Sequence, residues 1–222
     1  MAAQGFSVVT SAFFFIVALA QCAVVLVHGQ SQEGFISIDC GIADGANYTD
    51  DDTKITNVPD TGYIDAGMNR YLPSNIGMKS GLDTVYQTVR SFPEGIRNCY
   101  KLWPVRPDEK YLVRASFYYG NYDNKNSTPV FDLYIGVNLW RTIDHLSSSD
   151  DPFFEEIITV TPRNSNSLSV CLVNMGRGTP FISALELRPL PNSMYLLVNQ
   201  SQSLVFTYRR NYGATSELRY SL

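Results

Sequence analysis

The segment Tyr111–Asp123, with the sequence YLVRASFYYGNYD, indicates the fold class of this chain. Up to Tyr119 its side chains alternate between two faces, as they do along a β-strand. One face carries Tyr111, Val113, Ala115, Phe117 and Tyr119, and the other carries Leu112, Arg114, Ser116 and Tyr118. Gly120 and Asn121 then favour a turn. The segment predicts a strand that ends in a loop rich in tyrosine, and we call residues 118–123 the tyrosine loop.

Strand-like runs recur along the chain, and helical patterns are nearly absent after residue 29. The predicted strands are Phe35–Asp39, Val85–Ser91, Ile96–Leu102, Tyr111–Tyr119, Val130–Val137, Trp140–His145, Phe154–Val160, Ser167–Val173, Phe181–Arg188 and Leu204–Tyr208. Clusters of Gly, Pro, Asn, Asp and Ser separate them. Many short strands at fairly regular spacing predict an all-β, antiparallel β-sandwich of the jelly-roll kind.

Several blocks carry a resemblance to a known family. They are FISIDCG (Phe35–Gly41), YIDAGMN (Tyr63–Asn69), TVRSFPEGIRNCYKL (Thr88–Leu102), FDLYIGVNLW (Phe131–Trp140) and VCLVNMGRGTPFISALELRPL (Val170–Leu190). In this order, with Tyr111–Asp123 among them, they resemble the malectin-like ectodomain of plant leucine-rich-repeat receptor kinases, from about Phe35 to the C-terminus. The resemblance implies a malectin-type β-sandwich and a non-catalytic role outside the plasma membrane, in cell-wall or peptide perception.

The first 29 residues contain no Asp, Glu, Lys or Arg, and Ser7–Val27 is almost wholly apolar. Val27-His28-Gly29 resembles a cleavage site, so residues 1–29 are predicted to form a helical signal peptide that is removed before Gln30. The alternative is an uncleaved anchor, because the apolar run approaches the ~20 residues that span a bilayer. Without that anchor, no membrane span is predicted in the mature chain, which would be secreted to the apoplast. The resemblance places full-length relatives at the plasma membrane.

Residues 30–190 are predicted to form one malectin-like module. Arg188-Pro-Leu-Pro-Asn192 marks a boundary, because two prolines disfavour a continuing central strand. Residues 191–222 then resemble a linker and the truncated start of a second module. We expect residues after about Tyr195 to be poorly ordered or weakly docked, because such a fragment has little to pack against.

Beyond the leader the cysteines are Cys40, Cys99 and Cys171. In an oxidising compartment they allow one disulfide with three possible pairings. The alternative is that all three are small buried apolar residues. Three sequons, at Asn47, Asn126 and Asn199, predict glycosylation and surface loops.

Two segments supply candidate ligand-binding residues. In the tyrosine loop they are Tyr118, Tyr119, Tyr122 and Asp123, which resemble the region where animal malectin holds a disaccharide with aromatic rings and acidic groups. A competing interpretation is that Tyr119 belongs to the core, because it shares a strand face with Phe117. The second segment offers Tyr63, Asp65 and Asn69, an aromatic ring beside a carboxylate and an amide.

Composition and motifs argue against several functions. A net charge of −4 without a basic cluster disfavours nucleic acid and anionic membrane surfaces as partners. No GxSxG, HExxH or CxxC motif occurs, so we predict no enzyme activity, no metal and no cofactor. The predicted function is binding of a cell-wall oligosaccharide or a peptide, with a receptor kinase as a further partner. The alternatives are a soluble protein-interaction module or decoy without sugar binding, and an inactive receptor fragment.

Overall fold

The computed structural model describes residues 32–77, 81–146 and 152–207. The predicted signal peptide lies outside these residues. From Gly34 onward the described chain belongs to one compact unit. Its elements are strands joined by loops and three one-turn helices, η1 (Asp60–Gly62), α2 (Ser74–Gly77) and η2 (Thr84–Tyr86). Within the described residues no helix is both long and apolar enough to cross a membrane.

The largest sheet has seven strands. In spatial order they are β14 (Leu204–Val205), β10 (Phe153–Val160), β7 (Lys110–Phe117), β13 (Ala184–Leu190), β1 (Ile36–Asp39), β3 (Thr56–Pro59) and β2 (Tyr48–Thr49). All its pairs are antiparallel except β1 with β3. The prediction of a purely antiparallel sandwich is therefore wrong at one pair. The chain turns back through the β2–β3 hairpin and so returns beside β1 in the same direction.

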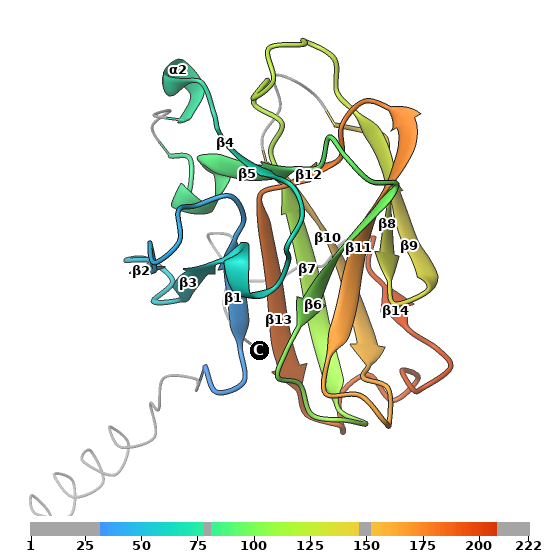
Figure 1. Cartoon of the computed structure of the whole chain (residues 1–222). Helices are drawn as coiled ribbons and strands as arrows, with labels where there is room; N and C mark the ends of the chain where they lie inside the picture. The colour runs from blue at the N-terminus through green and yellow to red at the C-terminus, as the bar shows by residue number, and fades with distance from the viewer. Residues whose placement is uncertain (1–31, 78–80, 147–151, 208–222) are drawn as a thin grey trace, which may run out of the picture. The chain divides into compact units, whose positions relative to one another are not determined.

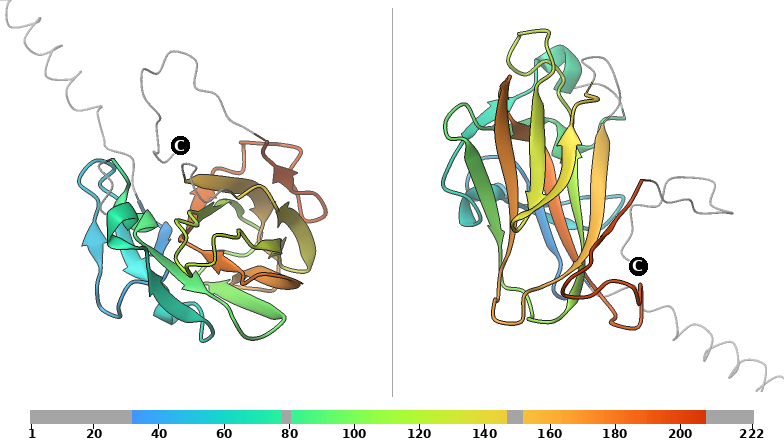
Figure 2. Two further views of the ribbon diagram at one scale, coloured as in Figure 1. Left: turned by 90° about the horizontal axis from the view of Figure 1, so that it is seen from above. Right: turned by 90° about the vertical axis from the view of Figure 1, so that its right-hand side faces the viewer.

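A second sheet faces the first (Figures 1 and 2). It contains four strands, in the order β6 (Arg97–Leu102), β11 (Leu168–Arg177), β8 (Val130–Ile135) and β9 (Asn138–Ile143). A third sheet, which we call the small sheet, contains β12 (Phe181–Ile182), β5 (Thr88–Ser91) and β4 (Met68–Tyr71). Figure 1 shows the small sheet at the same end of the sandwich as the loop that follows β7.

Strand β7 is buried on both faces, not on one as its alternating sequence suggests. The face with Val113 and Phe117 points into the main core. On the opposite face, Leu112 packs in a second apolar cluster and Arg114 forms an ion pair with Glu156 at 2.7 Å. Because β7 pairs with β10 on one side and β13 on the other, it is a central strand with no open edge.

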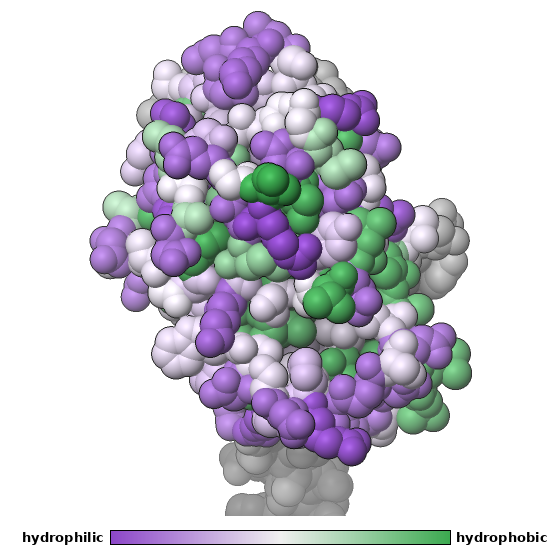
Figure 3. All heavy atoms as spheres, turned by 45° about the vertical axis from the view of Figure 1, so that its right-hand side comes forward, coloured by the Kyte–Doolittle hydropathy of each residue, from purple (hydrophilic) through white to green (hydrophobic). Residues whose placement is uncertain are grey.

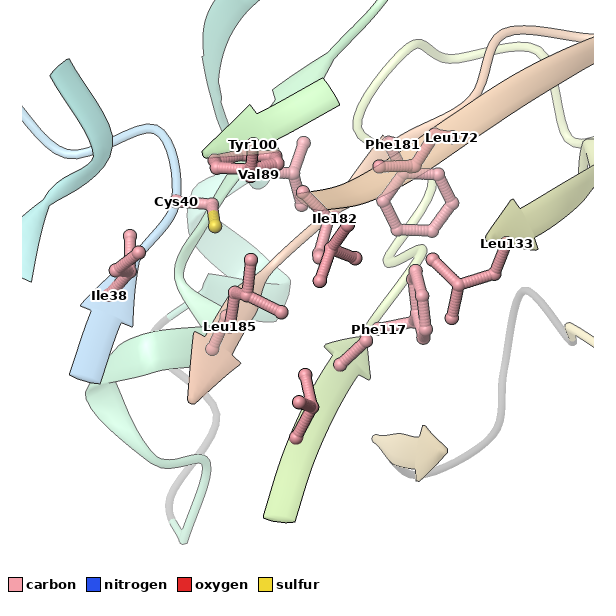
Figure 4. Close-up of a cluster of buried hydrophobic side chains, with 14 of the residues drawn as sticks. Ile38, Cys40, Val89, Tyr100, Phe117, Leu133, Leu172, Phe181, Ile182 and Leu185 are labelled. Atoms are coloured by element: carbon pink, nitrogen blue, oxygen red, sulfur yellow. The ribbon is translucent and has the colours of Figure 1, made fainter. Parts of the chain in front are cut away.

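Aromatic rings fill the space between the facing sheets. The ring of Phe117 lies 5.8 Å from that of Phe131 and 6.2 Å from that of Phe181. All three side chains are fully buried, which stabilises the fold by about 2–3 kcal/mol for each ring. Figure 4 shows Phe117 and Phe181 in one continuous cluster with Leu133, Ile182 and Leu185. This cluster joins both large sheets to the small sheet.

Two predicted strands are divided in the structure. Of the predicted strand Val85–Ser91, Val85 and Tyr86 belong to the one-turn helix η2, and only Thr88–Ser91 forms a strand. The run Phe181–Arg188 is interrupted at Ser183, where the chain leaves the small sheet and enters the seven-stranded sheet. The Ser183 N–H donates to the Ser116 carbonyl and its hydroxyl accepts from the Tyr118 N–H, so the crossing point is hydrogen-bonded.

The segment that follows the predicted boundary packs against the sandwich. The Lys110 ammonium donates to the carbonyls of Asn192, Met194 and Tyr195 at 2.8–3.2 Å. Val198 is buried in the second apolar cluster, and β14 extends the seven-stranded sheet beside β10. Residues 195–207 are therefore docked on the sandwich, and the expectation that they are poorly ordered or weakly docked stays a prediction. Residues 208–222 lie outside the described part of the chain.

One of the three possible disulfides is present. Cys99 on β6 and Cys171 on β11 are directly paired in the four-stranded sheet and bonded to each other. Cys40 remains a free, buried thiol in the main core, in agreement with the apolar role considered for it. Figure 4 shows its sulfur among Ile38, Val89 and Tyr100.

Removal of the disulfide is expected to destabilise the fold strongly. The bond closes a loop with a sequence separation of 72 residues. Loss of that constraint in Cys99→Ser/Cys171→Ser should lower the free energy of unfolding by about 4 kcal/mol. Urea denaturation followed by circular dichroism measures the change. Cys40→Ala, which keeps the disulfide, is the control and should lose only about 1 kcal/mol. Equal unfolding midpoints for the double variant and the unmodified chain would contradict the expectation.

Candidate ligand-binding site

The aromatic rings of the tyrosine loop are buried. Tyr119 is 1% exposed and Tyr122 is 8% exposed, and Tyr118 is also buried. The Tyr122 ring lies 5.2 Å from the Phe181 ring and 5.7 Å from the Tyr119 ring. The loop therefore does not offer the exposed stacking faces that its sequence suggests. The competing interpretation, that Tyr119 belongs to the core, is confirmed.

The backbone folds the loop back over the core. Gly120 and Asn121 have φ angles of +47° and +53°, in the left-handed region that favours glycine and tolerates asparagine. A Cβ atom at Gly120 would lie 2.7 Å from Leu72 Cδ2, so the loop also packs closely against the chain just after β4. These contacts place the tyrosine loop beside the small sheet.

Asp123 holds the loop in this conformation. Its Oδ1 atom accepts from the Tyr119 hydroxyl at 2.6 Å and from the Lys125 N–H at 3.2 Å. Burial, and after it the hydrogen bond to Asp123, raises the pKa of Tyr119 to about 12. The Lys125 ammonium lies 3.9 Å from Asp123 Oδ2. Asp123 is half-buried and serves first as a structural acceptor.

Tyr122 presents a buried hydroxyl without a hydrogen-bond partner among the described residues. Burial raises the pKa of this hydroxyl, and the charge of Asp123 adds to the effect. The positive charge of Arg70 lowers the same pKa. Arg70 is an exposed residue of β4, and its charge acts on the hydroxyl through space.

The second candidate segment divides into surface and structural residues. Asp65 is exposed and Tyr63 is half-buried. Asn69 lies on β4, where its amide nitrogen donates to the Ile42 carbonyl at 3.1 Å and its oxygen accepts from the Arg90 guanidinium. Asn69 therefore connects the small sheet to a buried network.

Arg90 is the centre of that network. Its Nε atom donates to the Ala66 carbonyl at 2.9 Å, and its Nη1 atom lies 3.5 Å from Asp60 Oδ1. Asp60 is fully buried and accepts a hydrogen bond from the Tyr100 hydroxyl at 2.9 Å. Burial raises the pKa of Asp60, while the charge of Arg90 opposes that change. Arg90 thus compensates a carboxylate that would otherwise be isolated in the core.

The small sheet brings the two predicted segments together. Tyr122 packs on Phe181, which pairs with Ser91 of β5, and Ser91 pairs in turn with Met68 of β4. Sequence reasoning missed β4 because it has only four residues and no clear alternation. Its exposed side chains are prominent, since Met68 is 45% exposed and Tyr71 is 68% exposed.

The exposed aromatic rings are not those that the sequence singled out. Tyr71 lies on β4, and Trp103, 51% exposed, lies just after β6 and donates from Nε1 to the Gly62 carbonyl at 3.4 Å. Figure 3 shows one face of the molecule, where apolar patches are interrupted by polar side chains. Within the described residues, no group of three or more side chains is arranged to hold a metal ion.

All three sequon asparagines are exposed. Asn126 follows the tyrosine loop, and its side-chain oxygen accepts from the Asn121 amide at 2.9 Å. Asn199 lies in the segment docked near β10, and Asn47 precedes β2. Their positions suit glycosylation, which remains a prediction.

A malectin-like domain family model matches residues 38–222. A probable leucine-rich-repeat receptor-like serine/threonine-protein kinase of Arabidopsis thaliana is 44% identical over 193 residues, which are 86% of this chain and 22% of the relative. A second probable kinase of this type from the same plant, MEE39, is 45% identical over 195 residues, covering 87% of this chain and 21% of the relative. The chain therefore spans about a fifth of the length of these relatives.

Solved structures show the same fold. The plant receptor-like kinase FER aligns with a TM-score of 0.61 at 18% identity, over 78% of this chain and 47% of that one. The extracellular domain of ANXUR2 from Arabidopsis thaliana aligns with a TM-score of 0.57 at 21% identity, over 71% of this chain and 42% of that one. A third structure holds the plant peptide RALF23 in complex with FER and LLG2, with a TM-score of 0.56 at 17% identity, over 71% of this chain and 49% of that one.

Alkaline pH should reduce the stability that the buried, hydrogen-bonded Tyr119 hydroxyl contributes to the fold. The pKa of Tyr119 is about 12 in the folded chain and about 10 in an unfolded one, so its stabilising contribution is complete below pH 10. It is lost as the pH rises from 10 to 12. The unmodified chain should therefore be more stable than Tyr119→Phe at pH 8, and the difference should narrow above pH 10. Urea denaturation across this pH range measures the difference in the free energy of unfolding. A difference that stays constant with pH would contradict the raised pKa of Tyr119.

Removal of Arg90 should destabilise the fold by about 3–5 kcal/mol, because the Asp60 carboxylate would stay buried without compensation. Urea denaturation of Arg90→Leu measures this loss. The loss should diminish as the pH falls, since protonation of Asp60 removes the buried charge. Arg90→Leu/Asp60→Asn is the matched control and should recover part of the lost stability at neutral pH. A double variant less stable than Arg90→Leu would contradict the role given to Arg90.

Proposed function

Because this chain belongs to the malectin-like domain family, we propose that it is a non-catalytic, extracellular ligand-recognition module used in cell-surface perception. The observation that carries this proposal is the exposed strand β4, where Met68, Arg70 and Tyr71 all reach solvent. Apolar, aromatic and cationic side chains on a rigid sheet are well suited to binding.

A peptide or protein ligand is the class that we favour. The tyrosine loop keeps its rings inside the core, so the sugar-stacking surface predicted there is not available in this conformation. Among proteins of the same fold, FER occurs in a complex with the plant peptide RALF23 and with LLG2. By analogy, this module would bind an extracellular peptide, alone or with a receptor partner.

A cell-wall oligosaccharide is the second candidate. Tyr71 and Trp103 are exposed rings that can stack on a sugar, and Asp65 is an exposed carboxylate that can accept from its hydroxyls. Asp123 is a further polar candidate, because it is only half-buried. Both rings differ from the predicted ones, since Tyr71 lies on β4 and Trp103 directly follows β6.

The relatives are receptor-like kinases, of which this chain spans about a fifth. We propose that it corresponds to part of the extracellular region of such a receptor. A soluble form would act as a decoy that competes with a receptor for its ligand. Both arrangements need the same ligand-binding surface.

The ligand class can be tested by capture from apoplastic fluid. The full chain, produced through a secretory host, is immobilised on a biosensor and exposed to fractionated fluid. One portion of each active fraction is first treated with protease and another with pectin- and glucan-degrading enzymes. We expect protease alone to abolish binding. Met68→Ser/Tyr71→Ser should lower the captured amount about fivefold or more while leaving the circular dichroism spectrum unchanged.

A matched double variant controls for the loss of exposed apolar surface. Val137→Ser/Leu139→Ser removes two exposed apolar side chains, one just before β9 and one within it, and this variant should bind normally. Other results would replace the proposal. Loss of binding after polysaccharide digestion, with retention after protease, would favour the oligosaccharide. No binding from any fraction by a folded, monodisperse chain would indicate an inactive fragment.

A further inference from the structure

Strand β4 forms an open edge of the small sheet. It pairs with β5 on one side and is the last strand in the order β12-β5-β4. All four of its residues are exposed. An edge of this kind presents backbone N–H and C=O groups that can pair with another extended chain.

The register identifies which backbone groups face outward. Leu72 donates its N–H to the Gln87 carbonyl, so Leu72 and Gln87 form a hydrogen-bonded pair. Hydrogen-bonded and non-hydrogen-bonded pairs alternate along antiparallel strands. Arg70 and Met68 therefore bond inward to β5, whereas the N–H and C=O groups of Asn69 and Tyr71 point away from it. Among the described residues, no backbone hydrogen bond beyond the β4–β5 pair uses these outward groups.

The side chains of β4 add a charge and an apolar surface beside this edge. Met68 and Arg70 share one face, and the Arg70 Nη2 atom lies 3.9 Å from the Met68 sulfur. Arg70 is exposed and forms no ion pair with any described residue. By contrast, Arg163 pairs with Asp108, so its charge is already matched.

The tyrosine loop beside β4 carries no cationic side chain of its own, and Lys125, which follows it, lies near Asp123. The Tyr122 hydroxyl is buried, has no partner among the described residues, and lies within the influence of Arg70. The nearby carboxylate of Asp123 is already engaged by Tyr119 and lies close to Lys125. Because the Tyr122 hydroxyl is shielded from solvent, the group of β4 left to match a charged ligand is the Arg70 guanidinium, which suits a carboxylate.

We infer that β4 binds an extended peptide as an additional antiparallel strand of the small sheet, with an acidic side chain of the peptide placed opposite Arg70. Peptide residues opposite Asn69 and Tyr71 exchange backbone hydrogen bonds with them. The residue between these two projects toward Arg70 and carries the carboxylate. Met68 and Tyr71 contact the apolar side chains of the peptide on either face.

This inference rests on the proposed function and specifies its ligand and its site. A peptide fits better than an oligosaccharide because the outward groups alternate donor and acceptor at strand spacing, which an extended backbone matches and a sugar chain does not. An acidic sugar bound through Arg70 is the competing outcome of the test.

The test uses a positional-scanning library of fluorescein-labelled heptapeptides and measures fluorescence polarisation with the full, secreted chain. We expect selection of Glu or Asp at one position, with β-branched residues on either side of it. In the best peptide, changing the acidic residue to Gln should weaken binding about fivefold. Arg70→Gln should cause the same loss and should abolish the preference for Glu over Gln. Arg163→Gln removes the same charge elsewhere and should change nothing.

Backbone methylation then tests the strand geometry. N-methylation of the two peptide residues opposite Asn69 and Tyr71 should weaken binding by about tenfold or more, since their N–H groups are the donors to β4. N-methylation of the acidic residue between them should be tolerated, because its N–H points away. Equal effects at all three positions would overturn strand addition.

The remaining outcomes separate this inference from the proposed function. If apoplastic fluid supplies a protease-sensitive ligand whose binding is unchanged by Arg70→Gln, the module recognises peptides elsewhere and the inference fails alone. If no library peptide binds but an oligogalacturonide binds in an Arg70-dependent manner, the peptide assignment is overturned in favour of an acidic sugar. Absence of binding by both probes would also overturn it.

Discussion

The two-sided burial of β7 is the constraint on which the rest of the structure depends. Each residue from Lys110 to Phe117 is buried, so the strand needs a partner along both edges and a covering layer on both faces. Strands β10 and β13 supply the edges, and the four-stranded sheet covers the face with Phe117. The opposite face has to bury Arg114, which is possible because Glu156 lies beside it on the neighbouring strand. A charge in this position needs its partner on an adjacent strand, and the register of β7 with β10 provides it.

The fold class could be predicted from the sequence because the core strands carry their own signal. Segments such as Val130–Ile135 alternate, and turn residues separate them. Strand β4 gives no such signal, since Met68, Asn69, Arg70 and Tyr71 are all exposed and no periodic apolar face is needed. Such a strand forms because it pairs with β5, which lies about twenty residues later in the chain, and local sequence carries no signal of that pairing.

The orientation of the tyrosine rings in the candidate site could not be predicted from local sequence either. A tyrosine in a loop can turn its ring outward or inward, and composition does not distinguish the two. Here Phe181, which lies on β12 far along the chain, provides an apolar surface on which Tyr119 and Tyr122 pack. The two tyrosine rings therefore face inward. Of the four exposed residues of β4, the prediction included Asn69 but not Met68, Arg70 or Tyr71. The tyrosines support this end from inside the core, and β4 forms its exposed surface.

The docked segment 195–207 also has a consequence for solubility. Strand β10 is long and carries Phe154, Ile157 and Ile158, and without β14 its outer edge would be open. Open, apolar edges are templates for pairing between molecules. By binding the carbonyls of Asn192, Met194 and Tyr195, Lys110 fixes the chain at the start of this segment, which then places β14 along part of that edge. One lysine in the middle of the chain thereby helps to cover an edge of the largest sheet that would otherwise be open to pairing with a second molecule.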